Sequence, residues 1–233
     1  MSPTWTRRRS PTPPDSGRPF ARLAAALAAL LLVAASSPAC GKSKNENRIK
    51  PIMANLSIAA FPGTNSAVFL EKKSTTGDLV TVNVNLHTSS TINFDAFTLE
   101  FDYDPLLVQV SDVFEVNPAL LGDCCLLNRR DTCTPIQPQC VVNSDANSRG
   151  VFLLGVAAVP GGQTASVSAD TILVTLGFVA ATTIDPPGTR IKLISGAGHG
   201  DCEILQYGVP PAPAITDLLI PCLDLNATMT AAR

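Results

Sequence analysis

Residues 77–110 read GDLVTVNVNLHTSSTINFDAFTLEFDYDPLLVQV, and this stretch decides the fold. Apolar and polar residues alternate strictly in three runs, which turn residues separate. The apolar rows are Val80, Val82, Val84 and Leu86; Phe97, Leu99, Phe101 and Tyr103; and Leu106, Val108 and Val110. Period two over this length is typical of half-buried antiparallel strands, whose apolar face must pack on another sheet. The pattern therefore predicts an all-β fold, a two-sheet antiparallel β-sandwich.

Working outward from this stretch, about nine strands are expected. Their ranges are 57–60, 66–71, 79–87, 95–103, 106–111, 150–158, 171–180, 189–194 and 222–230. Two apolar rows are expected to face inward, one of Val80, Val82 and Val84, the other of Ile172, Val174, Leu176 and Phe178.

The order of these pieces resembles the cohesin domain over roughly residues 57–230. A Gly-Asp turn precedes the valine strand, and the aromatic strand ends in Tyr103-Asp104-Pro105. Arg149-Gly150 opens the strand 151–157, and a Pro187–Arg190 turn precedes Ile191–Leu193. The Tyr-Asp-Pro turn also occurs in other secreted sandwiches, including carbohydrate-binding modules, so the resemblance rests on order and spacing. It implies a jelly-roll sandwich of the cohesin kind.

The resemblance also implies a function. Cohesins bind dockerins, small calcium-loaded helical modules, which lie across one flat sheet face with apolar contacts at its centre and hydrogen bonds at its rim. This chain is therefore expected to be a non-catalytic binding module that needs no cofactor, with an exported, dockerin-type or other partner, in a setting that includes polysaccharide breakdown. Contact residues vary within the family, so none can be named here.

The alternative is a carbohydrate-binding or structural sandwich of a cell-envelope lipoprotein, with polysaccharide as the partner. Such modules present planar aromatic platforms. The single tryptophan, Trp5, lies in the N-terminal region described next, so the rest of the chain has none.

The N-terminal region has the features of an export signal over residues 1–39. Five arginines precede or enter a short apolar run, Leu23–Ala35, which is too short to span a bilayer as a mature helix. Cys40 follows this run and a small residue, which resembles a bacterial lipoprotein cleavage site and makes Cys40 the lipidation candidate. The alternative is ordinary signal cleavage, which leaves a secreted chain with a free Cys40. Residues 40–55 are expected to be a polar tether and 56–231 the sandwich.

Charge argues against nucleic acid as a partner. Residues 1–39 hold five of the 17 basic and one of the 19 acidic residues, so the remainder has a formal net charge of −6. A mildly acidic chain without a basic stripe lacks the electrostatic footprint of a nucleic-acid-binding protein. Lys42, Lys44, Arg48 and Lys50 follow Cys40, which suits a tether beside a membrane surface.

Six further cysteines indicate disulfides in an exported chain. Four of them lie in the stretch 122–141, which shows no strand periodicity and is expected to be a stapled inserted loop. The disulfide candidates are Cys124, Cys125, Cys133, Cys140, Cys202 and Cys222. Cys202 and Cys222 flank a proline-rich segment that they could close. A zinc site is the other interpretation, but there is no Cys-x-x-Cys pair and no histidine in the cluster.

No constellation of catalytic residues is found, so no enzyme activity and no resident metal are expected. His87 lies on the polar face of a strand, and His199 lies in a Gly-rich turn with Ser195 and Asp201, unlike a triad built on separate rigid elements. Glu100, Asp102 and Asp104 are interpreted as surface carboxylates and a turn residue. Residues 143–150 have some likeness to a calcium loop, but Arg149 stands where an oxygen ligand is required.

Overall fold

The computed structural model describes residues 50–63, 65–123, 125–126, 138–159, 162–194, 202–208 and 214–233. Among these residues, no helix has both the length and the apolar content that a bilayer crossing requires.

Within the described residues, the larger sheet has the strand order β1-β16-β12-β5-β9-β8-β7, with β13 paired to β5 and β14 paired to β13. Its strands are β1 (Met53–Ser57), β5 (Ala96–Tyr103), β7 (Cys125–Leu126), β8 (Gln139–Val142), β9 (Val151–Ala157), β12 (Ile184–Leu193), β13 (Cys202–Tyr207), β14 (Ile215–Asp217) and β16 (Thr228–Ala232).

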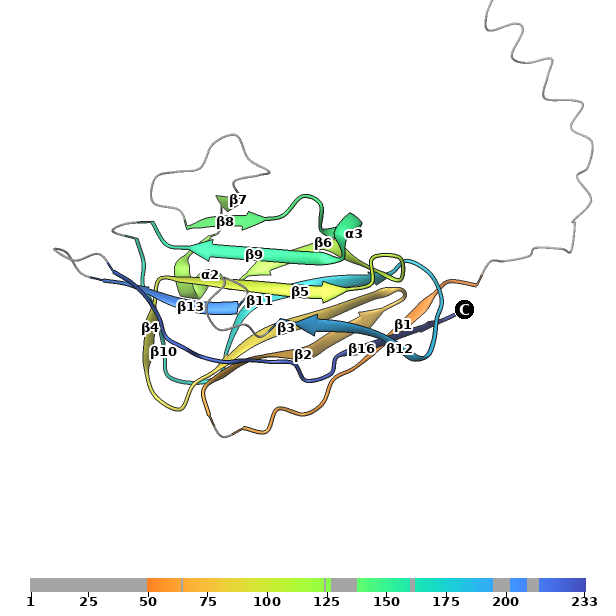
Figure 1. The fold of residues 1–233 in the computed structure, drawn as a ribbon, viewed down its shortest axis with the longest axis horizontal. Helices are drawn as coiled ribbons and strands as arrows, with labels where there is room; N and C mark the ends of the chain where they lie inside the picture. Colours follow the sequence, from red (N-terminus) through yellow and green to blue (C-terminus); the bar gives the residue numbers. More distant parts are fainter. Residues whose placement is uncertain are drawn as a thin grey trace, which may run out of the picture. The chain divides into compact units, whose positions relative to one another are not determined.

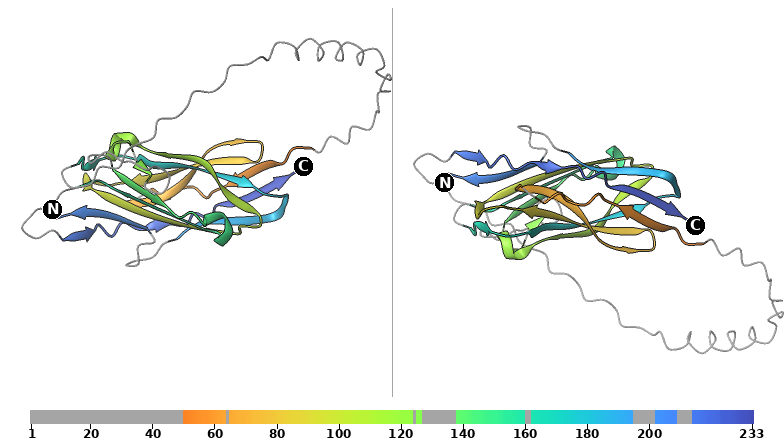
Figure 2. Two further views of the ribbon diagram at one scale, coloured as in Figure 1. Left: turned by 90° about the horizontal axis from the view of Figure 1, so that it is seen from above. Right: turned by 90° about the horizontal axis from the view of Figure 1, so that it is seen from below.

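The smaller sheet has the order β15-β2-β3-β11-β6. Its strands are β2 (Ala67–Thr76), β3 (Leu79–His87), β6 (Val108–Val116), β11 (Thr171–Ala180) and β15 (Cys222–Leu223); β4 (Ile92–Phe94) and β10 (Ala165–Val167) form a separate pair. The short helices are α2 (Pro118–Leu121) and α3 (Ala146–Arg149). Strands of the two sheets run along the same long direction (Figures 1 and 2).

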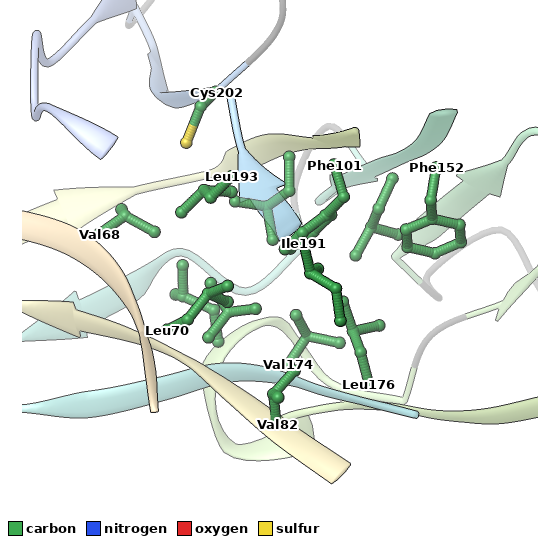
Figure 3. Close-up of a cluster of buried hydrophobic side chains, with 14 of the residues drawn as sticks. Val68, Leu70, Val82, Phe101, Phe152, Val174, Leu176, Ile191, Leu193 and Cys202 are labelled. Carbon is green, nitrogen blue, oxygen red and sulfur yellow. The ribbon is translucent and has the colours of Figure 1, made fainter. Parts of the chain in front are cut away.

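The core lies between the two sheets and is built from the alternating rows. Val82, Val174 and Leu176 of the smaller sheet face Phe101, Ile191 and Leu193 of the larger sheet (Figure 3). The rings of Phe101 and Phe178 meet across this layer with centroids 6.0 Å apart. The predicted all-β two-sheet sandwich is confirmed. Its ladders are antiparallel except for the two short pairs β15–β2 and β7–β8, which are parallel.

The inward orientation predicted for Ile172 is wrong. Ile172 is 38% exposed, whereas Val174, Leu176 and Phe178 are buried. A bulge between Ile172 and Val174 places an extra residue, Leu173, on β11. Because side chains alternate with period two, one extra residue moves Ile172 to the opposite face of the sheet.

Several expected boundaries are also wrong. The first strand is Met53–Ser57 and not 57–60, so it includes the end of the expected tether, and it pairs with β16 through Met53–Ala232. The expected strand 222–230 is two strands, β15 and β16, and β6 and β12 are longer than expected. In the expected cysteine loop, the last residues form β8, so that loop ends earlier than 141. Short strands such as β4, β10 and β14 carry too few alternations to be seen in the sequence.

Candidate functional site

Strand β9 is apolar on both of its faces. Phe152, Leu154 and Val156 are buried in the core. The alternate residues, which face outward, are Val151, Leu153, Gly155 and Ala157, and Leu153 is 39% exposed. A strand with one solvated face normally places polar residues there. The outward row of β9 is therefore a partly exposed apolar strip in the described structure.

The neighbouring strands extend this strip sideways. Gly155 lies opposite Thr98 of β5 and opposite Val141 of β8, and Val141 is 47% exposed. Leu153 lies opposite Glu100 of β5. The exposed apolar centre thus spans two adjacent strands of the larger sheet.

Polar and charged residues surround this centre. Asp102 of β5 lies opposite Lys192 of β12, Glu203 of β13 lies opposite Thr98, and Gln139 of β8 lies opposite Ala157. We call this surface the β9 face; its residues are Thr98, Glu100, Asp102, Gln139, Val141, Val151, Leu153, Gly155, Ala157, Lys192 and Glu203.

The centre of the β9 face has room above it. A Cβ atom built at Gly155 would have no atom within 4 Å. Beside it, the hydroxyl oxygen of Thr98 is buried and has no hydrogen-bond partner among the described residues. Glycine weakens a strand interior and often marks a place where another chain or a ligand approaches closely. Packing among the described residues therefore does not explain Gly155.

An apolar centre within a polar rim is the composition of a protein-binding surface. An aromatic platform for sugar rings is a different arrangement. Among the described residues, every Phe and Tyr side chain is buried or half-buried. The β9 face therefore has the apolar centre and polar rim that suit a protein partner. Its described residues include no exposed aromatic ring on which a sugar could stack.

The residues considered for catalysis are used elsewhere. His87, on β3 in the smaller sheet, is hydrogen-bonded through Nδ1 to Asp170 Oδ1 and lies against Phe61 with ring centroids 5.1 Å apart. In the described part of the chain, no serine or cysteine is hydrogen-bonded to His87. Ser195, His199 and Asp201 lie outside the described residues.

Asp104 and the asparagines of the calcium-like loop also form hydrogen bonds within the fold. Asp104 Oδ1 accepts the Leu106 N–H at 2.9 Å, which makes it the expected turn residue. In the loop, Asn143 Oδ1 accepts the Leu153 N–H at 2.8 Å and Asn147 Oδ1 accepts the Val110 N–H at 2.7 Å. The loop's amide oxygens thus hold the sandwich together. Within the described residues, no cluster of three or more His, Cys, Asp or Glu side chains could hold a metal ion.

The structure describes three of the six candidate cysteines in full. Cys202 and Cys222 form a disulfide with their Cα atoms 6.3 Å apart, as the sequence allowed. Cys140 is also disulfide-bonded. Cys125 lies in β7, and nothing further is described of its side chain. Cys40, Cys124 and Cys133 lie outside the described residues, so the loop's connectivity and the lipidation of Cys40 stay predictions.

The sequence analysis names no binding residue, and the β9 face supplies the residues it misses. The available signal is that residues 151–157 are apolar at odd and at even positions. Periodicity alone predicts that such a run is a strand buried on both faces. The pairing of β9 with β5 and β8 shows that one row is exposed, as does the lack of any described atom within 4 Å of a Cβ built at Gly155.

Comparison with known proteins gives solved structures only. No protein-family model matches the chain, and no curated protein sequence matches it. It is similar to a type II cohesin domain from the cellulosome of Acetivibrio cellulolyticus, at 12% identity and a TM-score of 0.45, over 71% of this chain and 95% of that one.

Two further similar structures are cohesins in complexes. One is the sixth cohesin of scaffoldin B of Acetivibrio cellulolyticus, in complex with a Cel5 dockerin mutant, at 12% identity and a TM-score of 0.44, over 69% of this chain and 96% of that one. The other is a type I cohesin–dockerin complex from Clostridium thermocellum, at 12% identity and a TM-score of 0.43, over 68% and 96%. At such identities these structures do not identify binding residues in this chain.

Proposed function

We propose that this protein is a non-catalytic binding module that docks another exported protein, of the dockerin type, on the β9 face. The observation that carries the proposal is the exposed apolar centre of Val141, Leu153 and Gly155 within a charged rim. The sequence resemblance to cohesins, which use a flat sheet face for this purpose, supports the same assignment.

The proposal includes export and anchoring. The signal-like residues 1–39 and the position of Cys40 support a lipid-anchored protein of the bacterial cell envelope, with the sandwich displayed beyond the tether. A setting in polysaccharide breakdown belongs to the same proposal, through the partner and not through direct sugar contact.

The non-enzymatic assignment rests on what the candidate catalytic groups do. His87 is paired with Asp170, Asp104 holds a turn, and the asparagines of the loop hold backbone groups. We therefore expect no turnover of glycans, esters or peptides.

The test compares the same substitution on the two outer faces of the sandwich. Leu153→Gln and Gly155→Gln change the centre of the β9 face, and Ile172→Gln is the control, because Ile172 has nearly the same exposure on the smaller sheet. Against a panel of purified dockerins, we expect Leu153→Gln to raise Kd at least about tenfold, equal to ~1.4 kcal/mol. Gly155→Gln should weaken binding further by filling the open centre, and Ile172→Gln should bind like the wild type.

Calorimetric titration measures these affinities, and circular dichroism confirms that each variant is folded. We expect an interface of about 800 Å² per partner, the standard size. Calcium should be required only through the dockerin. Equal loss in Ile172→Gln, or binding to soluble polysaccharide without any dockerin binding, would overturn the proposal.

A further inference from the structure

One end of the sandwich brings together the point where the chain enters the domain and two turns. Ala54 of β1 donates its N–H to Gly77 O at 2.7 Å, in the turn between β2 and β3. Ala180 N–H donates to Asp78 O at 2.9 Å, and Ala181 N–H donates to Leu107 O at 2.9 Å. The start of β1, the β2–β3 turn, the end of β11 and the β5–β6 turn are therefore neighbours. Figure 1 shows β1 and the C-terminus at this end, which we call the tether end.

The β5–β6 turn presents a leucine to solvent at the tether end. Leu106 is 80% exposed, and Met53, at the start of β1, is 56% exposed. The turn is held by hydrogen bonds from the N–H groups of Leu106, Leu107 and Val108 to Asp104. Next to it, Tyr103 N–H donates to Gly150 O at 2.8 Å. The turn therefore displays Leu106 from a fixed backbone.

The surroundings of Leu106 argue against a protein partner. Asp78, Asp104, Lys50 and Arg149 are exposed at the same end. Two separate apolar side chains among charged groups of both signs offer far less area than the roughly 800 Å² per partner of a standard protein interface. They can contribute to binding only if something else already holds the surface at this end.

The proposed anchor supplies that constraint. Ten residues lead from Cys40 to Lys50, and a chain of that length spans at most about 35 Å however it folds. A tether keeps the second contact at high effective concentration, so a weak contact becomes populated. An apolar side chain on a fixed turn can then enter the boundary between head groups and acyl chains.

We infer that the tether end of the domain lies against the lipid surface, with Leu106 inserted at the interface and Met53 at the same end of the domain. The inference rests on the proposed anchoring through Cys40. Strand β11, with ten residues, is about 33 Å long and runs away from this end. The β9 face then lies along the side of the anchored domain, where it is open to a partner.

Tryptophan reporters test the inference, because Trp5 is the chain's single tryptophan and lies within the proposed signal. Leu106→Trp places a reporter at the tether end. Leu219→Trp is the matched control, because Leu219 is 76% exposed and adjoins Leu218, whose N–H donates to Ile204 O of β13 at the far end of β5. Each full chain is expressed, purified from membranes and reconstituted into phosphatidylcholine vesicles.

For Leu106→Trp we expect emission at shorter wavelength and quenching by brominated phosphatidylcholine, and for Leu219→Trp neither. An unshifted Leu106→Trp, an equal shift of both reporters, or a shift that brominated lipid does not quench would overturn the inference. Labelled palmitate tests the anchor separately, and we expect label in the wild type and none in Cys40→Ala. A wild type without label overturns the anchor and with it the membrane contact, whereas a labelled wild type with an unshifted Leu106→Trp reporter overturns the membrane contact alone.

Discussion

At the scale of single residues, Asn147 joins helix α3 to strand β6. Its amide accepts the Val110 N–H at 2.7 Å and donates to Val110 O at 2.9 Å, and it also accepts the Tyr103 hydroxyl at 3.1 Å. A side chain thereby satisfies backbone groups on β6, which is the last strand of its sheet in the described structure. Exposed strand edges invite pairing with other chains, so this contact also protects the edge.

The buried phenol of Tyr103 predicts a stability change at high pH. Burial raises the pKa of Tyr103 to about 12, partly opposed by its hydrogen-bonded contact with Val110. The unfolded chain has the ordinary pKa of about 10, so above pH 10 the unfolded state ionises first. We expect the free energy of unfolding to fall as pH rises from about 10 to 12, and to fall less steeply in Tyr103→Phe. Urea denaturation at several pH values measures this, and parallel curves for the two proteins would contradict it.

At the scale of elements, strand β6 bulges over a glycine of β11. Three residues, 111–113, lie opposite Gly177 between the paired positions Phe114 and Val110. A Cβ atom at Gly177 would lie 2.1 Å from Ser111 Oγ and 2.9 Å from Val113 Cβ. The bulge therefore requires a residue without a side chain beneath it.

Gly177→Ala is expected to destabilise the domain by about 1–3 kcal/mol, the usual result of overpacking. Gly155→Ala is the matched control, since the same methyl group enters open space there and should change the free energy of unfolding by no more than about 0.5 kcal/mol. Chemical denaturation of the two variants gives the comparison. Equal stabilities would show that the bulge moves freely and that the contact at Gly177 is unimportant.

At the scale of the whole molecule, one disulfide links the two sheets. Cys202 is in β13 of the larger sheet and Cys222 is in β15 of the smaller sheet, 20 residues apart. The bond therefore joins the layers at the end of the sandwich where β13 and β15 lie. A crosslink of this kind restricts the unfolded chain, so its contribution does not depend on exposed contacts.

Removal of both sulfurs in Cys202→Ser/Cys222→Ser is expected to lower the free energy of unfolding by about 3 kcal/mol. The paired substitution avoids a stray thiol, and the bridge of Cys140 stays intact as an internal reference. Thermal and urea unfolding under oxidising conditions provide the measurement. A double variant as stable as the wild type would show that core packing alone holds the sheets together.

Much of the architecture was predictable because alternation is a local property. The rows of β3 and β5, and most of β11, could be assigned to the core from period two alone, since adjacent side chains of a strand point to opposite faces. Cys202 and Cys222 could be proposed as a pair because they flank one proline-rich segment. The sequence by itself therefore determined the fold class, the central strands and the class of molecule that the chain resembles.

Tertiary structure decided which apolar residues are exposed and which distant segments are neighbours, because alternation along one strand contains neither. The bulge that turns Ile172 outward depends on how β11 pairs with β3, and the exposure of Leu153 depends on which strands flank β9. Likewise, Leu106 and Met53 are 53 residues apart in the chain, and only hydrogen bonds between distant turns bring them to one end. Burial and proximity are properties of several segments together, so no single stretch of sequence contains them.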